Sequence, residues 1–142
     1  MAKIPDEVAD DAAVYVSDMM STGFAGAEAA DIPIGGTVAV FALCPVGLMA
    51  VAGAKFRGAG FIIGVDTVPK RQELSKFYGV DLIVDPSKEE AVSRIMDLSS
   101  GLGVDSSIEA LGAEITFQNA IRVTKAGGTI SNVGYHGSGE CV

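Results

Sequence analysis

Residues 37–47 read Thr37-Val38-Ala39-Val40-Phe41-Ala42-Leu43-Cys44-Pro45-Val46-Gly47, and this stretch decides the fold. It begins as a short apolar run, 37–42, with the length and branched side chains of a buried strand. Pro45 then stands where the first turn of a helix would begin, and residues 46–57 are apolar on nearly every side. A buried strand that turns directly into a buried helix is the first unit of an α/β sheet.

The same strand–helix unit recurs along the chain. Further apolar runs predict strands at 61–66, 81–85, 104–111 and 129–133, and helices at 69–79, 88–98 and 114–124. Upstream, residues 6–15 and 18–30 are expected to be helical. Such alternation requires parallel crossover connections, which are right-handed, so the predicted fold is a doubly wound parallel sheet with helices on both faces.

Three side chains near helix starts suggest where those helices begin. Ser17 or Asp18 is expected to cap the helix that follows, because short polar side chains there accept backbone N–H bonds. Ser87 is expected to cap the helix at 88–98, with Glu90 completing a capping box.

Length and composition narrow the classes of function. The chain has 142 residues, enough for one compact domain, and 49% hydrophobic residues exclude a disordered chain. A net charge of −8 argues against nucleic acid or an anionic membrane as partner. No apolar run reaches a membrane span, the N-terminus lacks signal-peptide features, and Cys44 and Cys141 form no CxxC pair. These features predict a cytoplasmic protein.

The turn at 42–47 resembles the glycine-rich turn that binds dinucleotides, G-x-G-x-x-G between a strand and a helix. Gly47 occupies the third glycine position, whereas Ala42 and Cys44 replace the first two. Ala42 adds one methyl group to the tight turn, which is a mild change. Cys44 places a Cβ and a sulfur where the backbone would approach the pyrophosphate; its thiol is either an inert packed group or a reactive one.

Asp66, at the end of the second predicted strand, lies 19 residues beyond Gly47. An acidic side chain at this position accepts hydrogen bonds from the adenosine ribose and repels a 2′-phosphate. The sequence therefore favours NAD over NADP, a preference that Lys70 and Arg71 would soften.

Several motifs together resemble one family along the whole chain. They are Asp18-Met19-Met20-Ser21-Thr22-Gly23-Phe24, Pro45-Val46-Gly47-Leu48-Met49-Ala50-Val51-Ala52-Gly53-Ala54, Arg57-Gly58-Ala59-Gly60, Gly103-Val104-Asp105, Ile108-Glu109-Ala110-Leu111-Gly112 and Gly127-Gly128-Thr129-Ile130. With these motifs the chain resembles the cofactor-binding segment of medium-chain, zinc-dependent alcohol dehydrogenases, most closely the bacterial secondary alcohol dehydrogenases.

The resemblance implies an activity and a domain division. The parent enzymes oxidise secondary alcohols to ketones by hydride transfer to a nicotinamide. Residues 1–36 would be a helical segment leading into a dinucleotide-binding domain at 37–142, with a sixth strand and the catalytic zinc domain absent. Asp18 matches one family zinc ligand, but the other ligands have no counterpart, so zinc is not expected in this chain.

The resemblance also assigns residues to the cofactor. Pro45 and Val46 start the helix that would face the pyrophosphate, and Thr22 would lie near the nicotinamide. The cleft would be lined by two loops, one with Ala110, Leu111 and Gly112 and one with Gly134 and Tyr135.

Other interpretations remain open at this point. Without the other zinc ligands, Asp18 is better explained as a helix cap. His136 is better explained as a solvated loop residue than as a catalytic base. Glu109 lies in a strand and needs a partner or solvent for its charge. The chain as a whole is a cofactor domain without turnover of its own, a stand-alone module that associates through an exposed sheet edge, or a fragment whose catalytic domain is a separate polypeptide.

Overall fold

Strand β1 (Thr37–Phe41) is the centre of a parallel sheet of five strands in a computed structural model that describes residues 3–137. The strand order is β3-β2-β1-β4-β5. The other strands are β2 (Phe61–Val65), β3 (Leu82–Val84), β4 (Val104–Glu109) and β5 (Thr124–Asn132). All four pairings are parallel, so the predicted doubly wound parallel sheet is confirmed.

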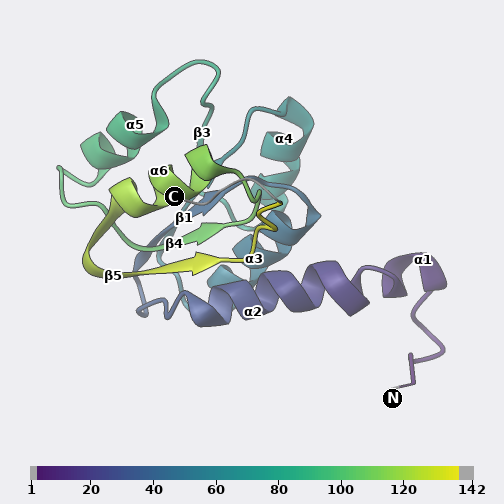
Figure 1. Ribbon diagram of the computed structural model, residues 1–142. Helices are drawn as coiled ribbons and strands as arrows, with labels where there is room; N and C mark the ends of the chain where they lie inside the picture. The colour runs from purple at the N-terminus through teal and green to yellow at the C-terminus, as the bar shows by residue number, and fades with distance from the viewer. Residues whose placement is uncertain (1–2, 138–142) are drawn as a thin grey trace.

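Helices cover both faces of this sheet (Figure 1). One face carries α2 (Ser21–Ala29), α3 (Pro45–Phe56) and α4 (Pro69–Tyr78), and the other carries α5 (Ala91–Leu98) and α6 (Glu114–Val123). A short α1 (Asp10–Ala13) and a π-helix, η1 (Val16–Met20), precede α2. Among residues 3–137, no helix combines the length and the apolar character needed to cross a membrane.

The core has two layers because successive strand side chains point to opposite faces. Val38 and Val40 of β1 pack in the layer under α2 and α3, whereas Ala39 and Phe41 pack in the layer under α5 and α6. Ala27 of α2 is fully buried in the first layer. Helix α2 therefore belongs to the packed body of the domain.

The prediction that Ser17 or Asp18 caps a helix is wrong, because no helix starts there. The π-helix runs into α2 without a break, and the Met20 N–H donates to the Tyr15 carbonyl at 2.9 Å, five residues back. The Ser17 hydroxyl donates to the Val14 carbonyl instead. Single π-helical turns occur often at functional sites.

The start of α5 also differs from the prediction. Glu90 is itself the N-cap, and its carboxylate accepts hydrogen bonds from Val92 N at 3.1 Å and Ser93 N at 2.6 Å. Ser87 lies in a turn four residues before the first residue of α5, too far back to cap it, and its hydroxyl donates to Asp85 Oδ1 at 2.6 Å.

Strand β5 begins directly after α6, earlier than predicted. Thr124 pairs with Val104, and the next pair is Thr129 with Ser106, so residues 125–128 loop out of the ladder. The predicted turn at these residues is thus an irregularity inside the strand, and Gly127 has the positive φ of +79° that it requires.

Carboxylates at the amino ends of two strands bond to the neighbouring strand. Asp105 Oδ2 accepts the Thr37 N–H at 2.7 Å, and Asp81 Oδ2 accepts the Ile62 N–H at 2.8 Å. The Lys125 ammonium also bonds to Asp105. The Lys125 hydrogen bond, followed by the Thr37 N–H, lowers the pKa of Asp105 below its ordinary value.

We expect Asp105→Asn to lower the free energy of unfolding by about 1 kcal/mol at pH 7, as for one charge-assisted bond. Because the folded pKa lies below the unfolded one, the ionised Asp105 stabilises the fold above the unfolded pKa. That contribution is lost as pH falls through the folded pKa. Urea unfolding at pH 7 and at about pH 3 should therefore show a smaller difference between the two proteins in acid. Asp97→Asn, on the exposed face of α5, is the control; a difference that does not change with pH contradicts the assignment.

Candidate functional site

The turn between β1 and α3 is built on one very close backbone approach. A Cβ added to Gly47 would lie 2.0 Å from the Ala42 carbonyl oxygen, so only glycine fits there. Ala42 has a φ of +71°, in the left-handed region that glycine adopts without strain. Alanine was expected to be a mild change at this position, but its backbone holds a conformation that is unfavourable for any residue with a Cβ.

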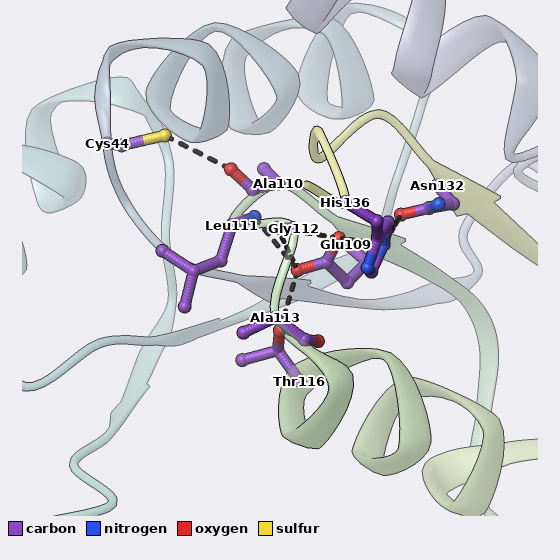
Figure 2. A network of polar contacts seen from close by, with 9 residues as sticks. All are labelled: Cys44, Glu109, Ala110, Leu111, Gly112, Ala113, Thr116, Asn132 and His136. Carbon is purple, nitrogen blue, oxygen red and sulfur yellow. Dashed lines mark hydrogen bonds and ion pairs between the residues drawn. The ribbon is translucent and has the colours of Figure 1, made fainter. Parts of the chain in front are cut away.

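Cys44 lies at the N-cap of α3 and reaches across to the loop after β4. Its Sγ is 3.4 Å from the Ala110 carbonyl oxygen (Figure 2). β1 and β4 are neighbours whose following helices lie on opposite faces, so the crevice beyond their carboxyl ends is the topological switch point where doubly wound sheets bind ligands. The Cys44 side chain therefore spans this crevice, with Pro45 at the first helical position beside it.

Asp66 joins the ends of β1 and β2. Its carboxylate is buried, with Oδ2 accepting the Leu43 N–H at 2.7 Å and Oδ1 accepting the Val68 N–H at 2.8 Å. Arg71 Nη1 is 3.7 Å from Oδ2. A carboxylate offers about four acceptor positions, so these contacts leave capacity for a further donor.

A cavity of about 260 Å³ opens beside Asp66. It brings together four of the residues singled out from the sequence, Ala42, Asp66, Arg71 and Leu111. The remaining lining residues were not predicted: Val65, Thr67, Val68, Pro86, Ile115 and Thr116. They lie at or beyond the carboxyl ends of β2, β3 and β4, and that position was the available signal. Lys70 is exposed and does not line this cavity.

Glu109 is fully buried at the end of β4 and is surrounded by donors (Figure 2). Its Oε1 accepts the Leu111 N–H and the Gly112 N–H, both at 2.9 Å, and the Thr116 hydroxyl at 2.7 Å. His136 Nε2 lies 3.5 Å from Oε2. The partners that a buried carboxylate requires are thus present, and two of them are backbone N–H groups of the loop that was predicted to line the cleft.

The two loops predicted to flank the cleft lie in contact. A Cβ on Gly112, whose φ is +81°, would lie 2.1 Å from the Tyr135 carbonyl oxygen, and one on Gly134 would lie 2.2 Å from Gly112 N. The Tyr135 residue itself is 87% exposed. Both glycines are needed for the loops to approach this closely.

Asp18 and Thr22 form a pair beside the start of α3. The Thr22 hydroxyl donates to Asp18 Oδ1 at 3.1 Å, and a Cβ on the next residue, Gly23, would lie 2.6 Å from the Val46 carbonyl oxygen. A zinc site takes three or four protein ligands. Among residues 3–137, no three His, Cys, Asp or Glu side chains gather to hold a metal, and Cys141 lies outside the described residues. Asp18 by itself does not make a zinc site.

The sequence of the chain is similar to those of known dehydrogenases. The sequence matches the zinc-binding dehydrogenase family over residues 45–142. It is 50% identical over 140 residues to an NADP-dependent isopropanol dehydrogenase of Thermoanaerobacter brockii, covering 99% of this chain and 40% of that protein. An alcohol dehydrogenase of Cupriavidus necator is 46% identical, covering 97% of this chain and 38% of that protein.

Solved structures share the fold. The alcohol dehydrogenase TADH from Thermus sp. ATN1 superimposes with a TM-score of 0.89 at 29% identity, over 98% of this chain and 40% of that one. A Sinorhizobium meliloti protein of the same class, solved with NADP bound, superimposes with a TM-score of 0.81 at 30% identity, over 87% of this chain and 36% of that one.

These features define a Rossmann-type nucleotide-binding domain. The chain belongs to the zinc-binding dehydrogenase family and corresponds to the NAD(P)-binding domain of its alcohol dehydrogenases. It spans about 40% of the length of the relatives it matches.

We expect Ala42→Gly to stabilise the domain by about 1 kcal/mol, because it removes the left-handed strain at φ +71°. Ala52→Gly is the control. Ala52 lies in the middle of α3, where glycine is less favourable than alanine, so its replacement should lower stability by roughly 1 kcal/mol. Thermal unfolding of the three proteins measures both effects; an Ala42→Gly variant as unstable as Ala52→Gly would show that the turn is not strained.

Proposed function

We propose that this chain binds a nicotinamide dinucleotide across the carboxyl ends of β2, β1 and β4. The observation that carries the proposal is the cavity beside Asp66, whose lining includes Ala42 after β1 and Leu111 after β4, the two strands of the switch point. Its walls, formed in part by Val68, Leu111 and Ile115, are mostly apolar and suit a flat adenine ring. Asp66 has acceptor capacity left for a ribose hydroxyl.

The pyrophosphate would lie over the first turn of α3. The first N–H groups of this helix have no partner inside it, and the helix dipole favours an anion there. Gly47 lets the helix approach Ala42 closely. Cys44 opposes this arrangement, because its side chain spans the crevice toward Ala110. We therefore expect binding that is weaker than a glycine at position 44 would allow.

The nicotinamide half would continue over the ends of β4 and β5. A dinucleotide that starts beside Asp66 and crosses the α3 terminus extends toward the far half of a doubly wound sheet. There it would meet the loop at 110–112 and the segment at Gly134–Tyr135, with Thr22 nearby on α2. The nicotinamide ring supplies the hydride chemistry, and the residues of this chain bind and orient it.

Oxidation of a secondary alcohol by the whole protein is part of the same proposal. The isopropanol dehydrogenase relatives support this substrate class. Of the expected zinc ligands, the described residues supply only Asp18, whose carboxylate is exposed beside the start of α3. Turnover therefore requires further ligands from outside residues 3–137, and this chain without them should not oxidise alcohols.

The choice between NAD and NADP depends on two neighbouring charges. A buried carboxylate at Asp66 disfavours a 2′-phosphate, which supports a preference for NAD. Arg71, 3.7 Å away, would offset part of that repulsion, and the relatives named as NADP-dependent show that the family uses NADP as well. We propose binding of both nucleotides, with NADH the tighter.

Calorimetric titration of the purified chain with NADH and NADPH tests the proposal. We expect saturable binding of NADH, tighter than NADPH, and at least a tenfold gain in affinity for both in Cys44→Gly, because the side chain leaves the crevice. Cys44→Ser retains a Cβ and a polar atom and should show little gain. A dimer without nucleotide affinity in any of the three proteins would refute the proposal and favour association through the exposed edge strand β5.

A further inference from the structure

We propose that Glu109 is a positioning residue that holds together the two loops receiving the nicotinamide half of the dinucleotide. The inference rests on the proposed dinucleotide binding and adds a residue through which the site is shaped. Glu109 is the only charged residue among the largest fully buried side chains of residues 3–137. A buried charge is costly unless donors surround it, so its surroundings must be closely organised.

The backbone of Glu109 already connects the two loops. Its carbonyl oxygen accepts the Val133 N–H at 2.9 Å and the Gly134 N–H at 3.0 Å, both after β5. Its side chain accepts the N–H groups of Leu111 and Gly112, both after β4. One residue at the end of β4 thus bonds to both loops.

One carboxylate oxygen shapes the loop after β4. The consecutive N–H groups of Leu111 and Gly112 converge on Oε1, with Gly112 in the left-handed region, and Thr116 adds its hydroxyl from the first turn of α6. Successive N–H groups of this kind form an anion-binding concavity. Because Glu109 occupies this concavity, the loop keeps its shape without a ligand. A phosphate of the dinucleotide would therefore bind at the N-terminus of α3 and not at this loop.

The other oxygen faces the segment after β5. His136 Nε2 lies 3.5 Å from Oε2 and 3.1 Å from Asn132 Oδ1 (Figure 2). The His136 ring also packs edge-on to Phe117. A Cβ on Gly134 would lie 2.3 Å from Oε2, so this segment passes directly against the carboxylate. Oε2 also accepts the Gly112 N–H at 3.1 Å. Oε1 therefore bonds only to the loop after β4 and to α6, whereas Oε2 lies against both loops. A substitution that changes only Oε2 thus tests the contact between the loops.

Glu109→Gln changes only Oε2. The amide keeps one acceptor oxygen for Leu111, Gly112 and Thr116. It replaces Oε2, which faces His136 and is the second acceptor for Gly112, by an uncharged NH₂ group. Fluorescence and calorimetric titrations with NADH and with ADP-ribose, which lacks the nicotinamide, measure the two halves of the site. We expect at least a fivefold loss of NADH affinity, a smaller emission change of bound NADH, and ADP-ribose affinity within twofold of the original protein.

Two further variants show whether a change in affinity reflects the contact with Glu109 or a general loss of structure. His136→Ala removes the partner from a half-buried surface position and should show the same selective loss of NADH affinity. Asp105→Asn is an acid-to-amide change at the opposite, amino end of the strands, and it should leave the ratio of NADH to ADP-ribose affinity unchanged.

The outcomes separate the inference from the function on which it rests. Equal losses of NADH and ADP-ribose affinity in Glu109→Gln, or no loss of either, would overturn the positioning role. ADP-ribose bound as tightly as NADH by the original protein would also overturn it, while dinucleotide-site binding itself stands. A protein that binds neither ligand refutes the proposed function, and the inference with it.

Discussion

The close approach of the Ala42 carbonyl to Gly47 is the constraint on which the rest of the domain depends. It lets α3 start immediately beyond β1, which brings the helix terminus to the crevice between β1 and β4. The approach excludes any side chain at position 47 and holds Ala42 at a positive φ. The strain lies at the site itself, whereas the stabilising burial is supplied by the two core layers below it.

Two buried carboxylates organise the loops around this turn. Asp66 bonds to the backbone of Leu43 and Val68, on the side of β2. Glu109 bonds to the backbone of Leu111 and Gly112, on the side of β4. Both charges are satisfied by N–H groups of the chain, so the loops are ordered before any ligand arrives. A preorganised site of this kind loses less entropy on binding.

The sequence predicted the architecture well, because apolar runs, Pro45 and the recurrence of strand and helix act locally. It predicted the starts of helices less well. Ser87 lies in a turn with Asp85, four residues before α5, and Glu90 caps the helix instead. No sequence pattern predicted the π-helix before α2. Ser17 has the side chain of an N-cap residue, but this residue type occurs there whether or not a helix begins.

The candidate site was predictable from the sequence only where its residues are set by local spacing. Asp66 and Gly47 followed from spacing alone, whereas the side of the cavity formed by Val68 and Ile115 depends on how separate loops meet. The donors around Glu109 come from segments that only the folded sheet brings together. Pairings of that kind are set by the tertiary structure and cannot be read from any one stretch of the chain.

The central claim is that a dinucleotide binds at the β1–β4 switch point, and amide NMR during addition of NADH tests it most directly. The account predicts shifts concentrated at the first turn of α3, at residues 66–68 and at residues 110–112, with the α3–α4 outer surface around Phe77 unchanged. Shifts confined to that outer surface, or no shifts with a folded spectrum, would contradict it.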